Sequence, residues 1–274
     1  MLYDLMLLNY LKKLVVLTAY RFGLKIHKTS KVFSQVGHPT KGNYLSLSEL
    51  NLNPSEQAIV KNFRTDRYYW LNEYRWRLLA KTGIQFADKV IFEPGAGIGD
   101  QTAWLLQEGA AKVISSDGRA SNIEICRKRF SKNSKVTNFV WDLEQPFDFL
   151  DVKFKSDIVY LWGVYYHIFD SIPDFPVLNK LSMIAPIIVM DFQMSTTGID
   201  HTRTYNYDTA SSSVSHHSWS LTLETMALGI RSHYGHAYFP IEQMNWDDPA
   251  TLSDPRKIII GSKLPLYYPG LVKA

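Results

Sequence analysis

The stretch KVIFEPGAGIGDQTAWL, residues 89–105, constrains the fold more than any other part of the chain. It begins with a short apolar run rich in β-branched residues, which is typical of a buried strand. Gly95, Gly97 and Gly99 then alternate with other residues, and an amphipathic helical pattern follows. Glycines allow a sharp turn and a close approach of a ligand to the backbone, and a helix start presents free N–H groups. The stretch therefore predicts a strand, a glycine turn and a helix that together bind a small ligand.

The alternation of strand and helix patterns continues after this stretch. The predicted strands cover residues 90–92, 112–116, 136–141, 157–161, 186–190, 236–241 and 257–261. Strands that alternate with helices in this way are the signature of a parallel, doubly wound sheet. We predict an α/β fold of the Rossmann-like type, with a seven-stranded, mostly parallel sheet and a helical extension at the N-terminus.

Three further segments complete the predicted organisation. Residues 56–82 predict one long helix, ended by Gly83, in which aromatic side chains alternate with arginines. Residues 192–218 show no periodicity and are too long for a connector, so we expect a lid or substrate loop there. Residues 220–228 predict a helix that ends at Gly229.

Acidic residues stand where several of the predicted strands end, and ligands of open α/β sheets bind beyond these carboxyl ends. Asp117 follows the second strand, 20 residues after Gly97, where a carboxylate can accept hydrogen bonds from ribose hydroxyls. Asp142 follows the third strand, where an acceptor would meet the exocyclic amine of adenine. Either residue would also fit a plain role as a cap of a turn or helix.

Four motifs resemble those of a known family. EPGAGIGDQT, SSDGR, WDLEQPF and DIVYLWGVYYHI, in this order and spacing, resemble motifs I to IV of class I S-adenosylmethionine-dependent methyltransferases. The resemblance covers residues 86–263, and the most similar pattern belongs to bacterial methyltransferase-domain proteins, many of which have no assigned substrate. Tyr165 stands where leucine is usual in a related family that acts on transfer RNA, so no substrate is carried over.

The resemblance implies S-adenosylmethionine as the cofactor. It implies that the three glycines contact the methionine and ribose part, that Glu93 lies near the amino group, and that Asp117 and Asp142 hold the ribose and the adenine amine. The cofactor-binding residues that it implies are Glu93, Gly95, Gly97, Gly99, Asp117, Gly118, Asp142, Leu143 and Gly163. No metal site is predicted.

Methyl transfer to a hydroxyl needs removal of a proton, and histidine is the usual base. His167, just beyond the fourth strand, is the candidate catalytic residue, with a structural imidazole as the alternative. The next candidate bases lie in the predicted lid: His216, His217 and His201. Candidates for the acceptor site are Tyr165, Tyr166, His216, His217 and Trp219. Aromatic packing and a polar turn before a helix are the alternatives for these residues.

We predict methyl transfer from S-adenosylmethionine to a small-molecule acceptor, at a hydroxyl oxygen of a sugar or glycan precursor. One alternative is an RNA methyltransferase that binds RNA through the basic aromatic helix at residues 61–81. Another is a methyltransferase-like interaction module without catalysis. A nicotinamide-dependent enzyme is disfavoured, because Asp100 stands where the dinucleotide fingerprint needs glycine.

The charge distribution and the single cysteine limit the partners and the cellular location that the sequence allows. Residues 1–90 carry a net charge of +8 and residues 91–274 one of −4, so a basic N-terminal part could meet an anionic partner. Residues 2–24 predict an amphipathic helix that covers the domain, pairs with a second subunit or lies on a membrane surface, and no transmembrane segment is predicted. Cys126 is the only cysteine, which fits a reducing cytoplasm. We divide the chain into a basic helical extension, 1–60, and a methyltransferase domain, 61–274, and leave the oligomeric state open.

Overall fold

The computed structural model describes residues 44–63, 66–144, 155–195, 197–200, 202–205, 217–244 and 256–274, without the side chains of 66–71, 202–205 and 217. All of them belong to the second of two compact units, Pro39–Ala274. The helix predicted at residues 2–24 lies outside the described residues. The predicted division after residue 60 stays a prediction.

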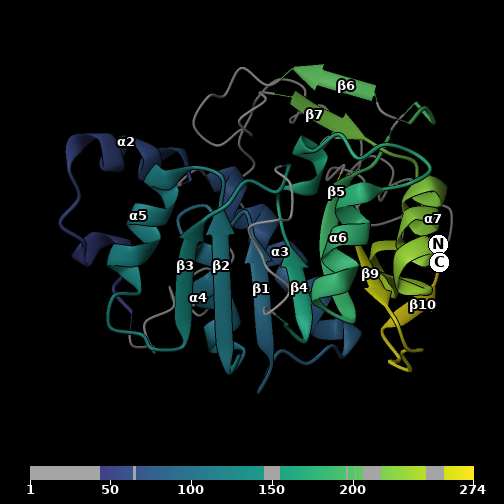
Figure 1. The fold of residues 1–274 in the computed structure, drawn as a ribbon, viewed down its shortest axis with the longest axis horizontal. Coiled ribbons are helices and arrows are strands. Elements are labelled where there is room, and N and C mark those ends of the chain that lie inside the picture. Colours follow the sequence, from purple (N-terminus) through teal and green to yellow (C-terminus); the bar gives the residue numbers. More distant parts are fainter. Residues whose placement is uncertain are drawn as a thin grey trace, which may run out of the picture. The chain divides into compact units, whose positions relative to one another are not determined.

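Eight strands form one sheet, in the order β10-β8-β9-β5-β4-β1-β2-β3 (Figure 1). The strands are β1 Val90–Pro94, β2 Lys112–Asp117, β3 Val136–Val140, β4 Ile158–Leu161, β5 Ile187–Gln193, β8 His236–Pro240, β9 Arg256–Ser262 and β10 Leu271–Lys273. The first five run parallel, and the last three pair antiparallel. The predicted α/β fold with a doubly wound, mostly parallel sheet is confirmed. The predicted number of seven strands is wrong, because β10 has three residues and is too short to show a strand period.

Helices cover both faces of the sheet (Figure 1). The helices are α2 Pro54–Asn62, α3 Asp66–Thr82, α4 Asp100–Gln107, α5 Ala120–Arg129, α6 Pro176–Ile184 and α7 Leu223–Tyr234, with short 3₁₀ turns η2 Leu47–Glu49, η4 Tyr165–His167 and η5 Ile241–Met244. Within the described part of the chain, no helix combines the length and the apolar character that crossing a bilayer requires.

Neighbouring residues of the central strands point to opposite faces, as the pleat requires. Ile91 and Ile158 pack with α3 and α4 on one face. Phe92 and Val159 pack with α6 and α7 on the other face. Because β1 and β4 are buried on both sides, their sequences are continuous apolar runs rather than alternating patterns.

Two helix predictions are wrong in detail. The single helix predicted at residues 56–82 is two helices: Asn53 caps α2 through reciprocal hydrogen bonds with Glu56, and α3 then ends before Gly83, whose φ is 84°. The helix expected to end at Gly229 continues to Tyr234. A Cβ at Gly229 would lie 2.9 Å from the Phe175 ring, so this glycine permits close packing inside α7 and is not a cap.

The segment predicted as an aperiodic lid contains regular structure. β6, Thr202–Tyr205, and β7, His217–Ser220, form an antiparallel ribbon (Figure 1). β7 contacts η4 and β5, so the ribbon lies at the carboxyl end of β5. The segment therefore brings described residues to the edge of the sheet at which ligands of this fold class bind.

Candidate active site

The three glycines of the loop after β1 all adopt left-handed backbone conformations. Their φ angles are 75° for Gly95, 55° for Gly97 and 82° for Gly99. A Cβ at Gly95 would collide with Val164, and one at Gly97 would lie 2.9 Å from the Phe63 ring. Other residues would be strained here by their backbone conformation as well as by these contacts. The glycine pattern in the sequence therefore reflects a real requirement of the backbone.

The end of β2 holds this glycine loop. The backbone N–H of Gly97 donates to Oδ2 of Asp117 over 2.9 Å, and that of Ala96 donates to the Ser116 carbonyl over 2.8 Å. Oδ1 of Asp117 accepts from the backbone of Arg119 over 2.9 Å and from the Asn122 amide over 3.1 Å. Burial raises the pKa of Asp117, and the hydrogen bonds oppose that rise. The structure thus brings Asp117 and Gly97 together, as the sequence predicts.

Helix α5 holds the same loop from a second side. The Cys126 thiol donates to the Gly97 carbonyl over 3.2 Å, and burial raises the pKa of this thiol well above its usual value. Nη1 of Arg129 donates to the Ile98 carbonyl over 3.1 Å and to Oδ1 of Asp100 over 2.8 Å. Neither contact follows from the sequence, because no local pattern shows which residue a helix side chain will contact.

Glu93, at the end of β1, is buried beside the loop. Its Oε2 accepts a hydrogen bond from the Thr102 hydroxyl over 2.5 Å, and its Oε1 has no hydrogen-bond partner among the described residues. Burial raises the pKa of Glu93 to about 8. A buried carboxyl oxygen without a partner costs free energy unless a ligand donates to it. An ammonium group fits this position, since it can donate to the oxygen and favour its ionised form.

Gly118 and Asp142 meet at the ends of β2 and β3. A Cβ at Gly118 would lie 3.6 Å from the Cα and Cβ atoms of Asp142. Oδ1 of Asp142 accepts from the backbone N–H of Glu144 over 3.0 Å, so this carboxylate oxygen stabilises the turn after β3. Leu143 is buried in the core cluster that contains Phe92. The structure therefore brings Asp142 next to Gly118, while contacts of Asp142 and Leu143 with an adenine ring stay predictions.

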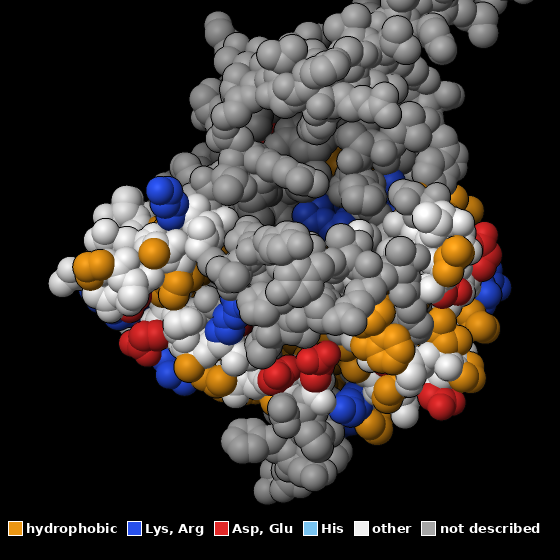
Figure 2. All heavy atoms as spheres, turned by 90° about the horizontal axis from the view of Figure 1, so that it is seen from above, with side chains coloured by type: hydrophobic (Ala, Val, Ile, Leu, Met, Phe, Trp, Pro, Cys, Tyr) orange, Lys and Arg blue, Asp and Glu red, His pale blue; other side chains and the backbone are white. Residues whose placement is uncertain are grey.

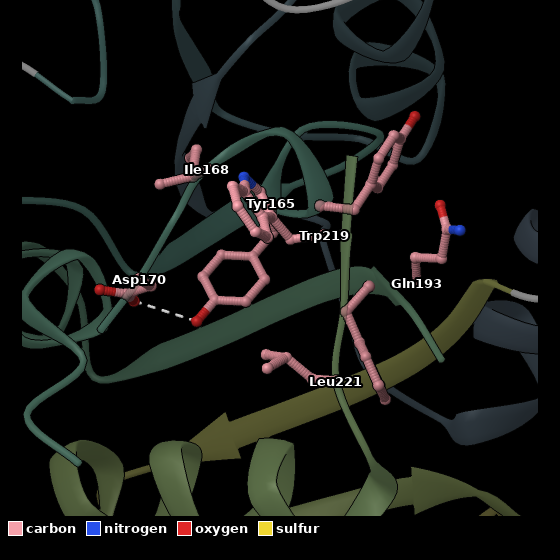
Figure 3. A pocket seen from close by; sticks show the side chains of 8 residues that line it. Tyr165, Ile168, Asp170, Gln193, Trp219 and Leu221 are labelled. Atoms are coloured by element: carbon pink, nitrogen blue, oxygen red, sulfur yellow. Dashed lines mark hydrogen bonds between the residues drawn. The ribbon is translucent and has the colours of Figure 1, made fainter. Parts of the chain in front are cut away.

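A small pocket lies beyond the carboxyl ends of β4 and β5 (Figure 3). Its walls are mostly aromatic and aliphatic, and they come from η4, β5 and the segment of β7. The lining residues are Tyr165, Tyr166, Ile168, Asp170, Phe192, Gln193, Trp219 and Leu221. Three of the predicted acceptor residues, Tyr165, Tyr166 and Trp219, thus line one pocket.

Tyr165 has a structural role within this pocket. Its hydroxyl donates to Oδ2 of Asp170 over 3.0 Å, as Figure 3 shows, and burial raises its pKa well above the usual value. Asp170 also accepts from the backbone N–H groups of Val177 and Leu178 at the start of α6. The carboxylate therefore caps α6 and fixes the Tyr165 ring in the pocket wall.

The candidate base lies next to the pocket but is not among its lining residues. His167 is buried, and its ring centroid is 4.3 Å from that of Tyr166. Its backbone N–H donates to the Val164 carbonyl over 2.8 Å, which closes the 3₁₀ turn. The roles predicted for His201, His216 and the side chain of His217 lie outside the described residues.

A buried charged network lies at this edge, and no local pattern in the sequence predicts it. Asp191 of β5 accepts from the backbone N–H of Gly163 over 2.5 Å and from Nη1 of Arg75 over 3.2 Å. Nη1 of Arg256, on β9, is 3.8 Å from Oδ2 of Asp191 and donates to the Tyr166 hydroxyl over 2.9 Å. Four segments far apart in the sequence meet here, and the pairing of β5 with β9 is what brings them together.

This network removes Arg75 from the surface proposed for RNA. The guanidinium of Arg75 is 1% exposed and lies 6.0 Å from the Trp162 ring centroid, so it stabilises the interior of the fold. Trp76 stacks on Trp104 with centroids 5.5 Å apart, so its ring also packs within the domain. Figure 2 shows one face of the molecule, and there the Lys and Arg side chains of the described residues are interspersed with Asp and Glu. The described part of the helix at 61–81 therefore packs on the sheet.

Comparison with known proteins gives a likeness in fold. No family model matches the chain, and no curated protein matches it in sequence. The N-terminal domain of EvdMO1, solved in the presence of S-adenosylhomocysteine and D-fucose, is 13% identical over 80% of this chain and 99% of that domain, with a TM-score of 0.52. A Listeria monocytogenes protein assigned as an S-adenosylmethionine-dependent methyltransferase is 12% identical over 69% of this chain and 98% of its own, with a TM-score of 0.50. The chain therefore has the fold of the S-adenosylmethionine-dependent methyltransferases.

Proposed function

We propose that the protein transfers a methyl group from S-adenosylmethionine to a hydroxyl of a small molecule, a sugar or glycan precursor. The observation that carries the proposal is the hydrogen bond between Gly97 and Asp117. It brings the glycine loop and the acidic end of the next strand together at one edge of a sheet with the methyltransferase order of strands. In open α/β folds ligands bind at this edge, which suits the adenosyl group of the proposed cofactor.

The described residues fit the cofactor. Glu93 offers a buried oxygen without a partner in the described part of the chain, which suits the ammonium of the methionine part. Asp117 has one Oδ2 lone pair beyond the hydrogen bond from Gly97, which suits a ribose hydroxyl. Asp142, beside Gly118, would accept from the adenine amine. The bound cofactor supplies an activated methyl group on a sulfonium, so the protein's main task is to orient the acceptor.

The mouth of the pocket beyond β4 and β5 is the proposed acceptor site, because the space inside has room for about one water molecule and a sugar ring would lie against its rim. Its aromatic walls suit the apolar face of a sugar ring, and the EvdMO1 domain, which has a similar fold, was solved in the presence of a sugar. His167 is the proposed base, because its buried ring lies beside the ring of Tyr166, which lines the pocket. It would take the proton of the acceptor hydroxyl as the oxygen forms its bond to carbon. A cytoplasmic location fits this function and stays a prediction.

The test is methyl transfer to free monosaccharides. The purified chain is incubated with S-adenosylmethionine and D-fucose, D-glucose or D-mannose, and mass spectrometry follows S-adenosylhomocysteine and the methylated sugar. We expect both products together. His167→Asn should lower the turnover about a hundredfold, because general base catalysis contributes at least that much, with unchanged affinity for S-adenosylhomocysteine. Release of S-adenosylhomocysteine without a methylated sugar, or equal turnover by His167→Asn, would contradict the proposal.

A further inference from the structure

We propose that Tyr166 recognises a hydroxyl of the sugar acceptor by donating a hydrogen bond to it, and that Arg256 and Asp191 are positioning residues for this hydroxyl. The inference rests on the proposed function and names residues that determine its specificity. Three observations carry it: the direction of the Arg256–Tyr166 hydrogen bond, the network behind it, and the position of Tyr166 at the pocket.

The hydrogen bond between Arg256 and Tyr166 has one possible direction. A guanidinium has only donors, so Nη1 of Arg256 donates and the phenol oxygen of Tyr166 accepts, over 2.9 Å. Within the described part of the chain the Tyr166 hydroxyl takes part in no other hydrogen bond. Its own proton therefore points away from the guanidinium and is left to donate to a ligand.

The guanidinium that fixes this proton is itself held in place. Arg256 lies over the Tyr166 ring, with its central carbon 5.3 Å from the ring centroid, and 3.8 Å from the Asp191 carboxylate. Asp191 is fully buried, and Arg75 and the Gly163 backbone hold it through hydrogen bonds. A side chain that charged partners hold in one rotamer positions a hydrogen-bond donor more precisely than a side chain that can change rotamer.

Tyr166 connects the pocket with the end of β4. Its ring is part of the pocket wall, and its hydroxyl lies 3.9 Å from the position that a Cβ at Gly163 would take. Gly163 follows Trp162 just after the end of β4, which lies beside β1 and its glycine loop. A donor at this junction lies between the proposed acceptor pocket and the carboxyl end of β4.

The polar groups of the pocket favour a neutral, hydroxyl-bearing ring. Across the pocket from Asp170, the amide of Gln193 makes no hydrogen bond within the described residues and can both donate and accept (Figure 3). The Asp170 carboxylate already accepts from Tyr165 and from the start of α6. Hydroxyls match such groups because they also donate and accept, and aromatic rings such as Trp219 pack on the C–H face of a sugar.

The experiment compares two tyrosines that each accept one hydrogen bond. Tyr166→Phe removes the proposed donor and keeps the ring, while Tyr238→Phe removes a hydroxyl that accepts from the Leu266 backbone over 2.9 Å away from the pocket. Calorimetry measures S-adenosylhomocysteine binding, and saturation-transfer NMR measures D-fucose binding with and without S-adenosylhomocysteine. We expect Tyr166→Phe to weaken D-fucose binding about five- to tenfold, the effect of one neutral hydrogen bond, and Tyr238→Phe to leave it unchanged.

Arg256→Met and Arg256→Lys test the positioning role. We expect Arg256→Met to weaken D-fucose binding as much as Tyr166→Phe, and Arg256→Lys to recover part of it, since lysine keeps a charged donor. Equal D-fucose binding by the wild type and Tyr166→Phe would overturn the inference, as would wild-type protein that binds S-adenosylhomocysteine but none of D-fucose, D-glucose and D-mannose. If the wild-type protein does not bind S-adenosylhomocysteine, the proposed function is contradicted instead. The comparison of D-fucose binding by the wild type and Tyr166→Phe, measured in the absence of S-adenosylhomocysteine, still decides the role of Tyr166.

Discussion

The two halves of the candidate site are held in different ways. The glycine loop after β1 is held by backbone hydrogen bonds, close contacts and side chains that follow it within the next strand and helix, such as Asp117 and Arg129. The proposed acceptor pocket is held by charged side chains from α3, β5 and β9, centred on Asp191. A change in the first half alters backbone geometry, whereas a change in the second half breaks a buried charged network.

This difference suggests how the two halves can vary. A loop that depends on left-handed glycines tolerates few substitutions, because each Cβ meets a neighbour. A pocket whose walls are side chains can change its ligand when single residues change, provided that the network behind it is kept. Four measurements of stability distinguish the two halves, and their expected effects decrease from the charged network to the pocket wall.

The largest effect is expected from the charged network. Asp191→Ala removes the carboxylate that accepts from Arg75 and Gly163, and we expect a loss of about 3–5 kcal/mol in the free energy of unfolding. Equilibrium unfolding in urea measures it. Asp157→Ala is the matched control, since its exposed carboxylate accepts from the Val90 backbone over 2.8 Å, and we expect about 1 kcal/mol. Equal losses for the two variants would contradict a network that holds the pocket.

The next effect concerns the glycine loop. Gly95→Ala combines a φ of 75° with a collision with Val164, and we expect a loss of about 3 kcal/mol. Gly235→Ala has a φ of 83° but open space around it, so only about 1 kcal/mol is expected from the backbone. The difference between the variants in urea unfolding isolates the steric part. A loss for Gly95→Ala no larger than that for Gly235→Ala would show that the loop tolerates a side chain.

The third prediction uses the buried carboxyl of the loop half. The pKa of Glu93 is about 8 in the folded protein against an ordinary 4.5, so between these values the folded state binds one more proton than the unfolded state. The free energy of unfolding should therefore fall as pH rises through this window, by up to about 1.4 kcal/mol per pH unit. Unfolding at pH 5.5, 6.5 and 7.5 should show this loss in the wild type relative to Glu93→Gln. Parallel pH profiles for the two proteins would mean that Glu93 is ionised in the fold.

The smallest effect concerns the pocket wall. Tyr165→Phe removes one hydrogen bond to Asp170, and we expect a loss of about 1–2 kcal/mol because the acceptor is a carboxylate. Asp170 keeps its backbone donors at the start of α6, so the pocket should stay formed. Thermal unfolding followed by circular dichroism measures the change. If Tyr165→Phe lost as much free energy of unfolding as Asp191→Ala, the hydrogen bond of Tyr165 would stabilise the pocket as strongly as the charged network does, which would contradict the comparison.

The two halves also differ in how far the sequence alone predicts them. Gly97 and Asp117 are 20 residues apart and are joined by one strand–helix–strand unit, so their meeting follows from local patterns. Arg75, Asp191 and Arg256 meet only because antiparallel β9 pairs with β5 and α3 packs on the sheet, which no local pattern indicates. For the same reason the sequence predicts that the helix ends at Gly229. The contact that places Gly229 inside α7 is with Phe175, which comes from a part of the chain distant in sequence.

The most direct test of the central claim is a calorimetric titration of S-adenosylhomocysteine into the wild-type protein, Asp117→Asn and Asp157→Asn. Oδ1 and Oδ2 of Asp117 both accept from backbone N–H groups. In Asp117→Asn the side-chain NH₂ group replaces one of these oxygens, so in either orientation of the amide one backbone N–H loses its acceptor and faces another donor. We expect one-to-one binding by the wild type, at least about tenfold weaker binding by Asp117→Asn, and an unchanged affinity for Asp157→Asn. Absence of binding by the wild type, or equal affinity for Asp117→Asn, would contradict an adenosyl site at the ends of β1 and β2.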